Sequence, residues 1–256
     1  MIIISWNVNG IRAVEKKGFV NWMEGCGADI ICLQETKAHK EQLSDKLLNI
    51  DSYKSYWSSG ERKGYSGVAT YSKIIPDKYE TGFGAHEKFD CEGRILATFL
   101  DDTVLLNIYF PNGQSSDERL QYKLDFYDAT LEFCEKLRGQ GKSLIICGDY
   151  NTAHNEIDLA RPNENVNVSG FLRIERDWMD KFESFGYVDT FRELHPDIAE
   201  AYSWWSYRTA ARSRNVGWRL DYFYITPDLL PKLKRAEILS DVMGSDHCPV
   251  LIELDI

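Results

Sequence analysis

Short apolar runs with strand-like composition recur along the whole chain, and they constrain its fold more than any other feature. Each run is too short for a typical helix and is rich in β-branched and aromatic residues, which is typical of strands in a well-buried sheet. The runs occupy residues 2–6, 29–34, 67–71, 94–100, 104–110, 143–148, 221–225 and 249–254. The chain is therefore expected to be built around β-sheet.

Two segments between these runs have the apolar periodicity of helices that cover a sheet. In the first, Ser115 and Glu118 have capping-box spacing, and Gly139 ends the pattern. Its apolar stripe consists of Leu120, Leu124, Tyr127, Leu131 and Cys134. The second stripe, ahead of Gly186, consists of Ile174, Trp178, Phe182 and Phe185. Because each helix has one apolar face and strands outnumber helices, we expect helices on the outer faces of two packed sheets.

The composition is that of an ordinary globular protein. With 256 residues, of which 43% are hydrophobic, the chain can build a large core, and no linker or low-complexity tract divides it. We therefore expect one domain spanning residues 1–256. No apolar run is long enough for a membrane span and the opening residues lack a secretory signal, so we expect a soluble, cytoplasmic protein. The six cysteines show no paired spacing, which fits reduced thiols and gives no support to a zinc site.

The charge pattern excludes one class of nucleic-acid-binding protein. A net charge of -10 argues against coating nucleic acid by bulk attraction. The segment 201–220 is different, because it has no acidic residue and interleaves four arginines, Arg208, Arg212, Arg214 and Arg219, with tryptophans and tyrosines. Cations beside aromatic faces hold phosphates and unstacked bases. Taken alone, the segment is more often a solvated loop with buried tryptophans.

Polar side chains follow several of the expected strands where each strand ends. Asn7 and Asn9 follow the first run, Glu35 follows the second, and Asp149 and Asn151 follow the run at 143–148. If these strands share a direction, their polar ends collect along one edge. Carboxylate and amide oxygens suit a hard divalent ion such as Mg²⁺ or Mn²⁺ better than zinc.

An Asp-His pair, Asp246 and His247, precedes the last run. By itself such a pair is usually a hydrogen-bonded structural feature. It belongs, however, to an ordered set of motifs: SWNVNG (5–10), LQETK (33–37), GYSGV (64–68), NIYFPNG (107–113), GDYN (148–151), GWRLDY (217–222) and SDHCP (245–249). In order and spacing, this set resembles the exonuclease III family of apurinic/apyrimidinic endonucleases. The resemblance implies an α/β, four-layer sandwich of two packed mixed sheets flanked by helices, similar to deoxyribonuclease I.

The resemblance also implies roles for residues that match the motifs. Glu35 would be the main ligand of Mg²⁺ or Mn²⁺, with Asn7, Asn9 and Asp246 near the ion directly or through water. Further residues at the ion and the phosphate would be Asp149, which binds or polarises the attacking water, Asn151, Tyr109, and His247 hydrogen-bonded to Asp221. Asn9 stands where some members have aspartate, which implies a smaller contribution to metal affinity.

For DNA recognition, Trp204, Trp218 and Leu220 match the hydrophobic pocket that accepts a sugar without its base. Tyr65, Asn112 and Arg208 match positions that contact or wedge DNA. A phosphate contact is implied at Asn165 or Asn167, and the register favours Asn165.

The implied activity is hydrolysis of the phosphodiester 5′ to an abasic site in duplex DNA, leaving a 3′-hydroxyl, by a monomer that also acts on blocked 3′ ends and as a 3′→5′ exonuclease. The alternative is a phosphodiesterase of the same fold acting on a non-nucleic-acid phosphate ester. Such enzymes use a second catalytic histidine, and no histidine lies beside the Tyr109 segment. A non-catalytic DNA-binding module ranks third, because it would not need a full set of acids.

Overall fold

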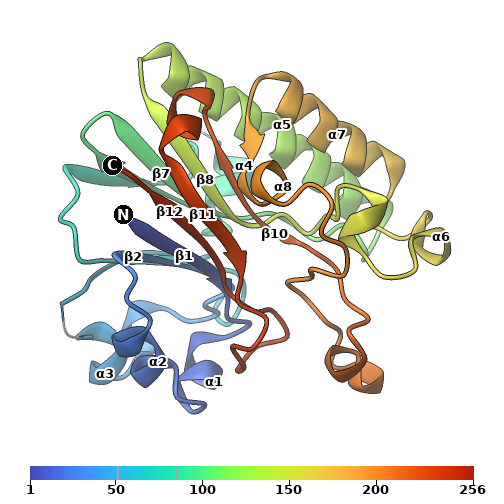
Figure 1. Cartoon of the computed structure of the whole chain (residues 1–256). Helices are drawn as coiled ribbons and strands as arrows, with labels where there is room; N and C mark the ends of the chain where they lie inside the picture. The colour runs from blue at the N-terminus through green and yellow to red at the C-terminus, as the bar shows by residue number, and fades with distance from the viewer. Residues whose placement is uncertain (51, 85) are drawn as a thin grey trace.

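Two six-stranded sheets lie face to face, and helices cover the outer face of each (Figure 1). The computed structural model describes residues 1–50, 52–84 and 86–256. The predicted four-layer sandwich is therefore confirmed. Among the described residues, no helix combines the length and apolar character that a membrane crossing needs.

Each sheet contains one parallel strand pair, and the other pairs are antiparallel. The first sheet has the order β11-β12-β1-β2-β4-β3. Its strands are β1 (Ile2–Asn7), β2 (Ile30–Gln34), β3 (Lys54–Ser58), β4 (Val68–Ser72), β11 (Leu233–Ile238) and β12 (Val250–Leu254). The second has the order β5-β6-β7-β8-β10-β9. Its strands are β5 (Lys78–Thr81), β6 (Ile95–Leu100), β7 (Thr103–Tyr109), β8 (Ser143–Asp149), β9 (Val188–Asp189) and β10 (Asp221–Ile225). The parallel pairs are β1 with β2 and β7 with β8.

Helices form the two outer layers. The helices are α1 (Ile11–Glu15), α2 (Phe19–Gly25), α3 (Asp45–Leu48), α4 (Glu87–Asp90), α5 (Asp117–Gly139), α6 (Pro162–Asn165), α7 (Arg173–Ser184) and α8 (Thr190–Leu194). Helix α8, however, contacts β10 of one sheet and β11 of the other. Short 3-10 helices lie at Lys40–Gln42, Glu156–Asp158, Arg208–Ala210, Arg212–Arg214 and Pro227–Lys232. Helices α1, α2 and α3 pack on the first sheet, and α5 and α7 lie side by side on the second (Figure 1).

The core between the sheets is apolar, with a polar link between the two sheets. Alternation along the strands sends Ile145 and Cys147 of β8 into this core, while Leu144 and Ile146 face α5 and α7. Asn107 of the second sheet donates to the carbonyl of Ala69 in the first, at 2.8 Å. Its side-chain oxygen accepts from Gln34 of the first sheet, also at 2.8 Å. These bonds hold the sheets in register with each other.

Every predicted strand is present, and the strands that the sequence analysis missed are the sheet edges. These are β3 and β11 in the first sheet and β5 and β9 in the second. Edge strands are short or carry polar residues, so they lack the continuous apolar run that marks a central strand. All residues of β5, for example, are exposed.

Two details of the helix predictions are wrong. The N-cap of α5 is Ser116 and not Ser115, because the Ser116 hydroxyl accepts from the backbone N–H of Arg119. In the second stripe, Ile174 and Phe185 are 52% and 44% exposed, so only the middle of that stripe packs on the sheet. The first error is a shift of one residue, which is within the usual ambiguity of helix ends.

The backbone of β8 approaches β7 so closely that Gly148 cannot carry a side chain. Its φ is +142°, and a Cβ atom there would lie 1.7 Å from the carbonyl oxygen of Ile108. Gly139, at the end of α5, has an ordinary φ and open space around it. We therefore predict that Gly148→Ala lowers the free energy of unfolding by about 3 kcal/mol or more. Gly139→Ala should leave it unchanged or raise it by up to about 1 kcal/mol.

Urea-induced unfolding of the two variants beside the wild type measures this difference. A wild-type midpoint for Gly148→Ala would show that β7 and β8 are farther apart than the structure has them.

Candidate active site

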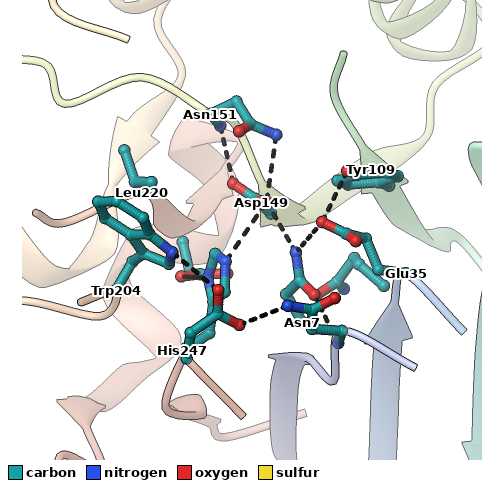
Figure 2. Close-up of polar contacts among 12 residues, drawn as sticks. Asn7, Glu35, Tyr109, Asp149, Asn151, Trp204, Leu220 and His247 are labelled. Carbon is teal, nitrogen blue, oxygen red and sulfur yellow. Dashed lines mark hydrogen bonds and ion pairs between the residues drawn. The ribbon is translucent and has the colours of Figure 1, made fainter. Parts of the chain in front are cut away.

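Polar side chains from both sheets meet at one end of the sandwich. Asn7 is the last residue of β1 and Glu35 follows β2, while Tyr109 and Asp149 are the last residues of β7 and β8. Because both strand pairs are parallel, each pair delivers its two side chains to the same edge. The neighbouring antiparallel strand β10 begins there, with Asp221 opposite Asp149. Figure 2 shows the resulting cluster.

A single amide joins carboxylates of the two sheets. The Asn7 Nδ2 donates to Glu35 Oε1 at 3.0 Å and to Asp149 Oδ2 at 2.8 Å (Figure 2). The Tyr109 hydroxyl donates to the same Glu35 oxygen at 2.6 Å. Asn7 is fully buried and Asp149 nearly so, which fixes both side chains. The two carboxylates, one from each sheet, are therefore held by the same amide.

His247 is held between two aspartates. Its Nδ1 lies 2.8 Å from Asp221 Oδ2, and its Nε2 lies 3.9 Å from Asp149 Oδ2. The hydroxyl of Ser203 donates to the same Asp221 oxygen at 2.6 Å. Burial alone would lower the pKa of His247, but Asp221, Asp149 and Asp246 raise it to about 10. The imidazole is therefore protonated at neutral pH, with its Nε2–H directed toward Asp149.

At Asp149, unlike at His247, the effect of burial on the pKa outweighs the effect of the neighbouring opposite charge. Burial raises the pKa of its carboxyl to about 7, with support from Asp221 and Glu35 and against the positive charge of His247. The backbone N–H of Asn151 donates to Asp149 Oδ1 at 2.8 Å, and the Asn151 side chain donates to Oδ2 at 3.2 Å. A carboxylate held in this way can exchange a proton near neutral pH.

On the other side of the cluster, Lys37 neutralises Glu35. Its Nζ lies 2.7 Å from Glu35 Oε2 and also donates to the side-chain oxygen of Asn9. Burial would raise the pKa of Glu35, but Lys37, Tyr109 and Asn7 together lower it. The sequence analysis gave Lys37 no role. The available signal was its place in LQETK, two residues after Glu35.

The backbone at this rim is in an uncommon conformation. Asn9, Glu35, Lys37 and Asn151 all have φ between 44° and 53°, although none is glycine. Side chains disfavour this left-handed region, so surrounding contacts must hold it. Such residues cluster at functional sites, and here they direct the polar side chains inward.

The fourth acid of the cluster is Asp246. Its Oδ1 accepts from Asn9 Nδ2 at 2.9 Å, and its Oδ2 accepts from the indole N–H of Trp204 at 3.2 Å. Burial would raise the pKa of Asp246, but His247 and these hydrogen bonds lower it. Asp246 therefore stays ionised beside the aromatic side of the site.

The acidic cluster can hold a metal ion. Ligand atoms of Asp149, Asp221 and His247 all lie within 4.8 Å of one another. Asp221 is buried, and its Oδ2 accepts from His247 and Ser203, while its Oδ1 has no hydrogen-bond partner among the described residues. Glu35 is the more accessible acid, and it shares the Asn7 amide with Asp149. The carboxylate oxygens of Glu35 and Asp149 fit a hard divalent cation better than the imidazole nitrogen of His247 does.

A cavity of about 750 Å³ opens over this cluster. Most of the predicted site residues line it: Glu35, Tyr109, Asn112, Asp149, Asn151, Asn165, Trp204, Arg208, Trp218, Leu220, Asp246 and His247. Asn7, Asn9 and Asp221 lie behind these residues and hydrogen-bond to them. Tyr65 and Asn167 are not among the lining residues, whereas Asn165 is.

The aromatic wall of the cavity stands beside the acids. Trp204 and Trp218 meet nearly perpendicular, at 87° and 6.4 Å between ring centroids, with Leu220 between them and the core. Phe171 packs edge-on behind Trp218 and was missed by the sequence analysis. Because it is 1% exposed, it supports the wall without lining the cavity.

The four arginines of segment 201–220 do not all lie at the cavity. Arg219 is fully buried and pairs with Asp158 and Asp189 at 2.8 Å and 2.7 Å. Arg212 donates to backbone carbonyls of the 240–245 loop. Of the four arginines, only Arg208 lines the cavity.

Tyr65 lies beside the cavity in a separate charged network. Its hydroxyl accepts from Arg94 at 2.9 Å and from Arg119 at 2.8 Å, and both arginines pair with Glu92. The Arg94 guanidinium also lies 4.5 Å from the ring centroid of Tyr109. Arg94, which the sequence analysis missed, thus links Tyr65 to the acidic cluster.

The histidines bear on the alternative phosphodiesterase. In the part of the chain that the structure describes, only His247 lines the cavity. His154, for example, is buried elsewhere and lies 2.7 Å from Asp180. A two-histidine site is therefore not formed at this cavity by the described residues.

The charge on His247 is directly testable. Its pKa of about 10 in the folded protein lies above the ordinary 6.5. The stabilisation from this proton is therefore complete below about pH 6.5 and is lost as the pH rises through about 10. We predict that NMR spectra of metal-free protein show a protonated His247 ring up to about pH 8. Asp221→Asn should lower its pKa, because the main opposing charge is removed.

Asp180→Asn is a matched control, since it affects His154 and should leave His247 unchanged. A wild-type His247 titration centred near pH 6.5 would contradict the assigned charge.

Comparisons with known proteins agree with this geometry. The exodeoxyribonuclease of Bacillus subtilis (strain 168) is 44% identical over 257 residues, covering 100% of both chains. The DNA-(apurinic or apyrimidinic site) endonuclease of Dictyostelium discoideum is 38% identical over 259 residues, covering 100% of this chain and 71% of that protein. A solved structure of a 3′ phosphatase from Neisseria bound to product DNA hairpin has a TM-score of 0.89 at 27% identity, covering 100% of both chains.

These similarities confirm the resemblance inferred from the motifs. A model of the endonuclease/exonuclease/phosphatase family matches residues 4–247, which is most of the chain. The protein therefore belongs to the endonuclease/exonuclease/phosphatase family.

Proposed function

We propose that this protein is a divalent-metal-dependent DNA repair nuclease that hydrolyses the phosphodiester on the 5′ side of an abasic site in duplex DNA. The observation that carries the proposal is the position of Trp204, Trp218 and Leu220 in the same cavity as Asp149 and His247. An acidic, histidine-containing cluster suits phosphate hydrolysis, and an apolar wall beside it suits a sugar that has lost its base. The product would be a 3′-hydroxyl end.

Asp149 is proposed as the group that takes a proton from the attacking water. Its pKa of about 7 is suited to this task at neutral pH. His247, Tyr109 and Asn151 are proposed to donate hydrogen bonds to phosphate oxygens as negative charge develops. Asp221 holds the His247 ring through Nδ1, which leaves Nε2–H for the phosphate. Water adds to phosphorus, the bond to the 3′ oxygen breaks, and that oxygen receives a proton.

Mg²⁺ or Mn²⁺ is the proposed cofactor. We propose Glu35 as its main ligand, with the remaining contacts, direct or through water, drawn from Asn7, Asn9, Asp149, Asn151, Asp246 and His247. When bound, such an ion would neutralise negative charge on the phosphate. The amide oxygen of Asn9 contributes less neutralisation than a carboxylate would. Lys37 occupies the outer oxygen of Glu35 and would have to move for that oxygen to bind an ion.

The aromatic wall is proposed to select the abasic nucleotide after it rotates out of the duplex. Trp204, Trp218 and Leu220 would contact the sugar, and the indole N–H of Trp204 keeps its hydrogen bond to Asp246. A nucleotide with its base would have to fit a larger group against the same wall. The cavity is therefore proposed to favour the abasic nucleotide, which is the smaller of the two.

Contacts to the rest of the duplex are proposed for Tyr65, Asn112, Asn165 and Arg208. Asn112 is exposed and donates to Asn151 at 3.1 Å, which places it next to the phosphate-binding group. Arg208 is exposed at the cavity mouth. These side chains would orient the DNA without requiring a positively charged protein overall.

We further propose activity on blocked 3′ ends and 3′→5′ exonuclease activity, because the similar proteins include an exodeoxyribonuclease and a 3′ phosphatase. Residues 1–256 are proposed to act as one catalytic domain and as a monomer in the cytoplasm. The one-domain proposal rests on the sequence pattern, in which no linker or low-complexity tract divides residues 1–256.

The main test uses a duplex with one abasic analogue. The wild type with Mg²⁺ or Mn²⁺ should incise it on the 5′ side, and EDTA should stop the reaction.

Asp149→Asn should lower kcat by about 10²-fold to 10⁴-fold, the usual contribution of a proton-transfer group, while DNA binding changes little. Wild-type-like kcat in this variant would remove Asp149 from its role. Hydrolysis of an inositol phosphate or a phospholipid, and not of the DNA, would support the alternative phosphodiesterase.

The aromatic wall is tested separately. Trp218→Ala should reduce the preference for abasic over intact duplex, because it removes part of the surface that the sugar contacts. The ratio of kcat/KM for the two substrates measures this. Tyr79→Ala is a control that removes a 50% exposed aromatic side chain from the edge strand β5, and the ratio should not change. An unchanged ratio in Trp218→Ala would place the selective pocket elsewhere.

A further inference from the structure

A fully buried ion pair lies behind the site, between the two long helices of the outer layer. Lys123 of α5 and Glu175 of α7 are 2.6 Å apart, and both side chains are 0% exposed. Lys123 lies on the face of α5 that packs against the sheet, where the sequence pattern would place an apolar residue. Neither residue belongs to the cluster described above, and the proposed chemistry uses neither.

Lys123 holds the chain segment that follows β8. Besides Glu175, its ammonium donates to the carbonyl oxygen of Asn151 and to the hydroxyl of Thr152, each at 2.8 Å. All three N–H groups of the ammonium therefore have partners. Asn151 is the residue that holds Asp149 from both its backbone and its side chain. Lys123 thus fixes the main chain on which the phosphate-facing amide is mounted.

Glu175 holds the loop that supports the aromatic wall. Its Oε2 accepts from the backbone N–H groups of Gly170 at 2.6 Å and Leu172 at 3.1 Å, and its Oε1 accepts from Ser169 at 2.9 Å. A Cβ atom on Gly170 would lie 3.2 Å from both the Trp218 ring and the Asn151 carbonyl oxygen. The 169–172 loop is therefore packed between the wall and the catalytic segment.

Stability does not explain this pair. Desolvating two charges costs several kcal/mol per ion, and well-packed neutral replacements are often as stable or more so. Removing one partner is different, since it leaves a buried charge unpaired. A pair that contributes little net stability, yet bonds to two functional segments at once, suggests a role in geometry.

We propose that Lys123 and Glu175 are positioning residues that couple the aromatic wall to Asn151, so that a sugar seated on the wall finds Asn151 and Asp149 correctly placed for hydrolysis. The inference rests on the proposed function. The pair acts on the placement of the reacting groups and leaves the DNA contacts unchanged. Its loss should therefore appear in kcat and not in the affinity for DNA.

The variant that tests this is Lys123→Met with Glu175→Gln. It keeps the shape of both side chains and leaves no buried charge unpaired. The glutamine can still accept from Gly170 and Leu172, whereas Asn151 and Thr152 lose their donor. We expect kcat on abasic duplex to fall by about 10-fold to 10²-fold, the size of effect that a displacement of about 1 Å produces, with Kd changed by less than about threefold.

The matched control removes an exposed ion pair between the same two helices. Lys181 of α7 lies 2.8 Å from Asp128 of α5, with side chains 48% and 62% exposed. Lys181→Met with Asp128→Asn should leave kcat within about twofold of the wild type, because this pair touches neither segment. An equal loss of kcat in the control would overturn the proposal, since the effect would then belong to helix packing in general.

A double-mutant cycle with Asn151→Ala separates positioning from a structural effect, measured under single turnover. Because Lys123 holds the main chain at Asn151, neutralising the pair should lower the rate less when the Asn151 side chain is absent, and the part that remains reflects the backbone N–H that holds Asp149. The same loss in both backgrounds, or wild-type kcat in the neutral-pair variant, would overturn the inference.

Thr152→Val, which removes one acceptor of Lys123, is the milder variant if the neutral pair does not fold. It should lower kcat in the same direction, and a wild-type value there would also overturn the inference. Failure of the wild type to incise abasic DNA would instead reject the proposed function.

Discussion

The Asn7 amide, buried where the two sheets meet, bonds to Glu35 of one sheet and positions Asp149 of the other, and the rest of the site is arranged around these two contacts. The arrangement follows from topology. Each sheet has one parallel strand pair, and parallel strands end at the same edge. Antiparallel neighbours begin at that edge, which adds Asp221 and the Asp246–His247 pair. Residues scattered from position 7 to position 247 therefore meet without any long loop having to carry them there.

The charges at this edge explain why the cluster suits a cation. Among the described residues, the cations that form ion pairs with the four carboxylates of Glu35, Asp149, Asp221 and Asp246 are Lys37 and protonated His247. At the 3.9 Å that separates His247 from Asp149, opposite charges attract by about 4 kcal/mol at an effective dielectric of 20. Full ionisation would still leave two uncompensated negative charges. Burial, with the charges of Asp221 and Glu35, raises the pKa of Asp149, and a divalent ion would supply balancing positive charge.

The central layers could be predicted from the sequence, because a central strand must be apolar along its length and a catalytic side chain follows it directly. Edge strands such as β5 could not, since their exposure removes that pattern. Local motifs located the acids and the tryptophans but not the partners of charged residues. Arg219, one of the four arginines of segment 201–220, is buried against Asp158 and Asp189, which no local motif predicts. Lys123 interrupts an apolar helix face for a reason that only its contacts with Asn151 and Glu175 reveal. Such pairings join residues distant in sequence, and neither periodicity nor a short motif encodes them.

The most direct test of this account is a crystal structure with product DNA and Mn²⁺, in which anomalous scattering locates the ion. The ion should lie at the Glu35 carboxylate, with the cleaved phosphate within hydrogen-bond distance of Tyr109, Asn151 and His247 and the abasic sugar against Trp204 and Trp218. An ion bound on another face of the molecule, or a phosphate out of reach of the Asn7-linked carboxylates, would contradict the claim that the two sheets jointly build one metal and phosphate site.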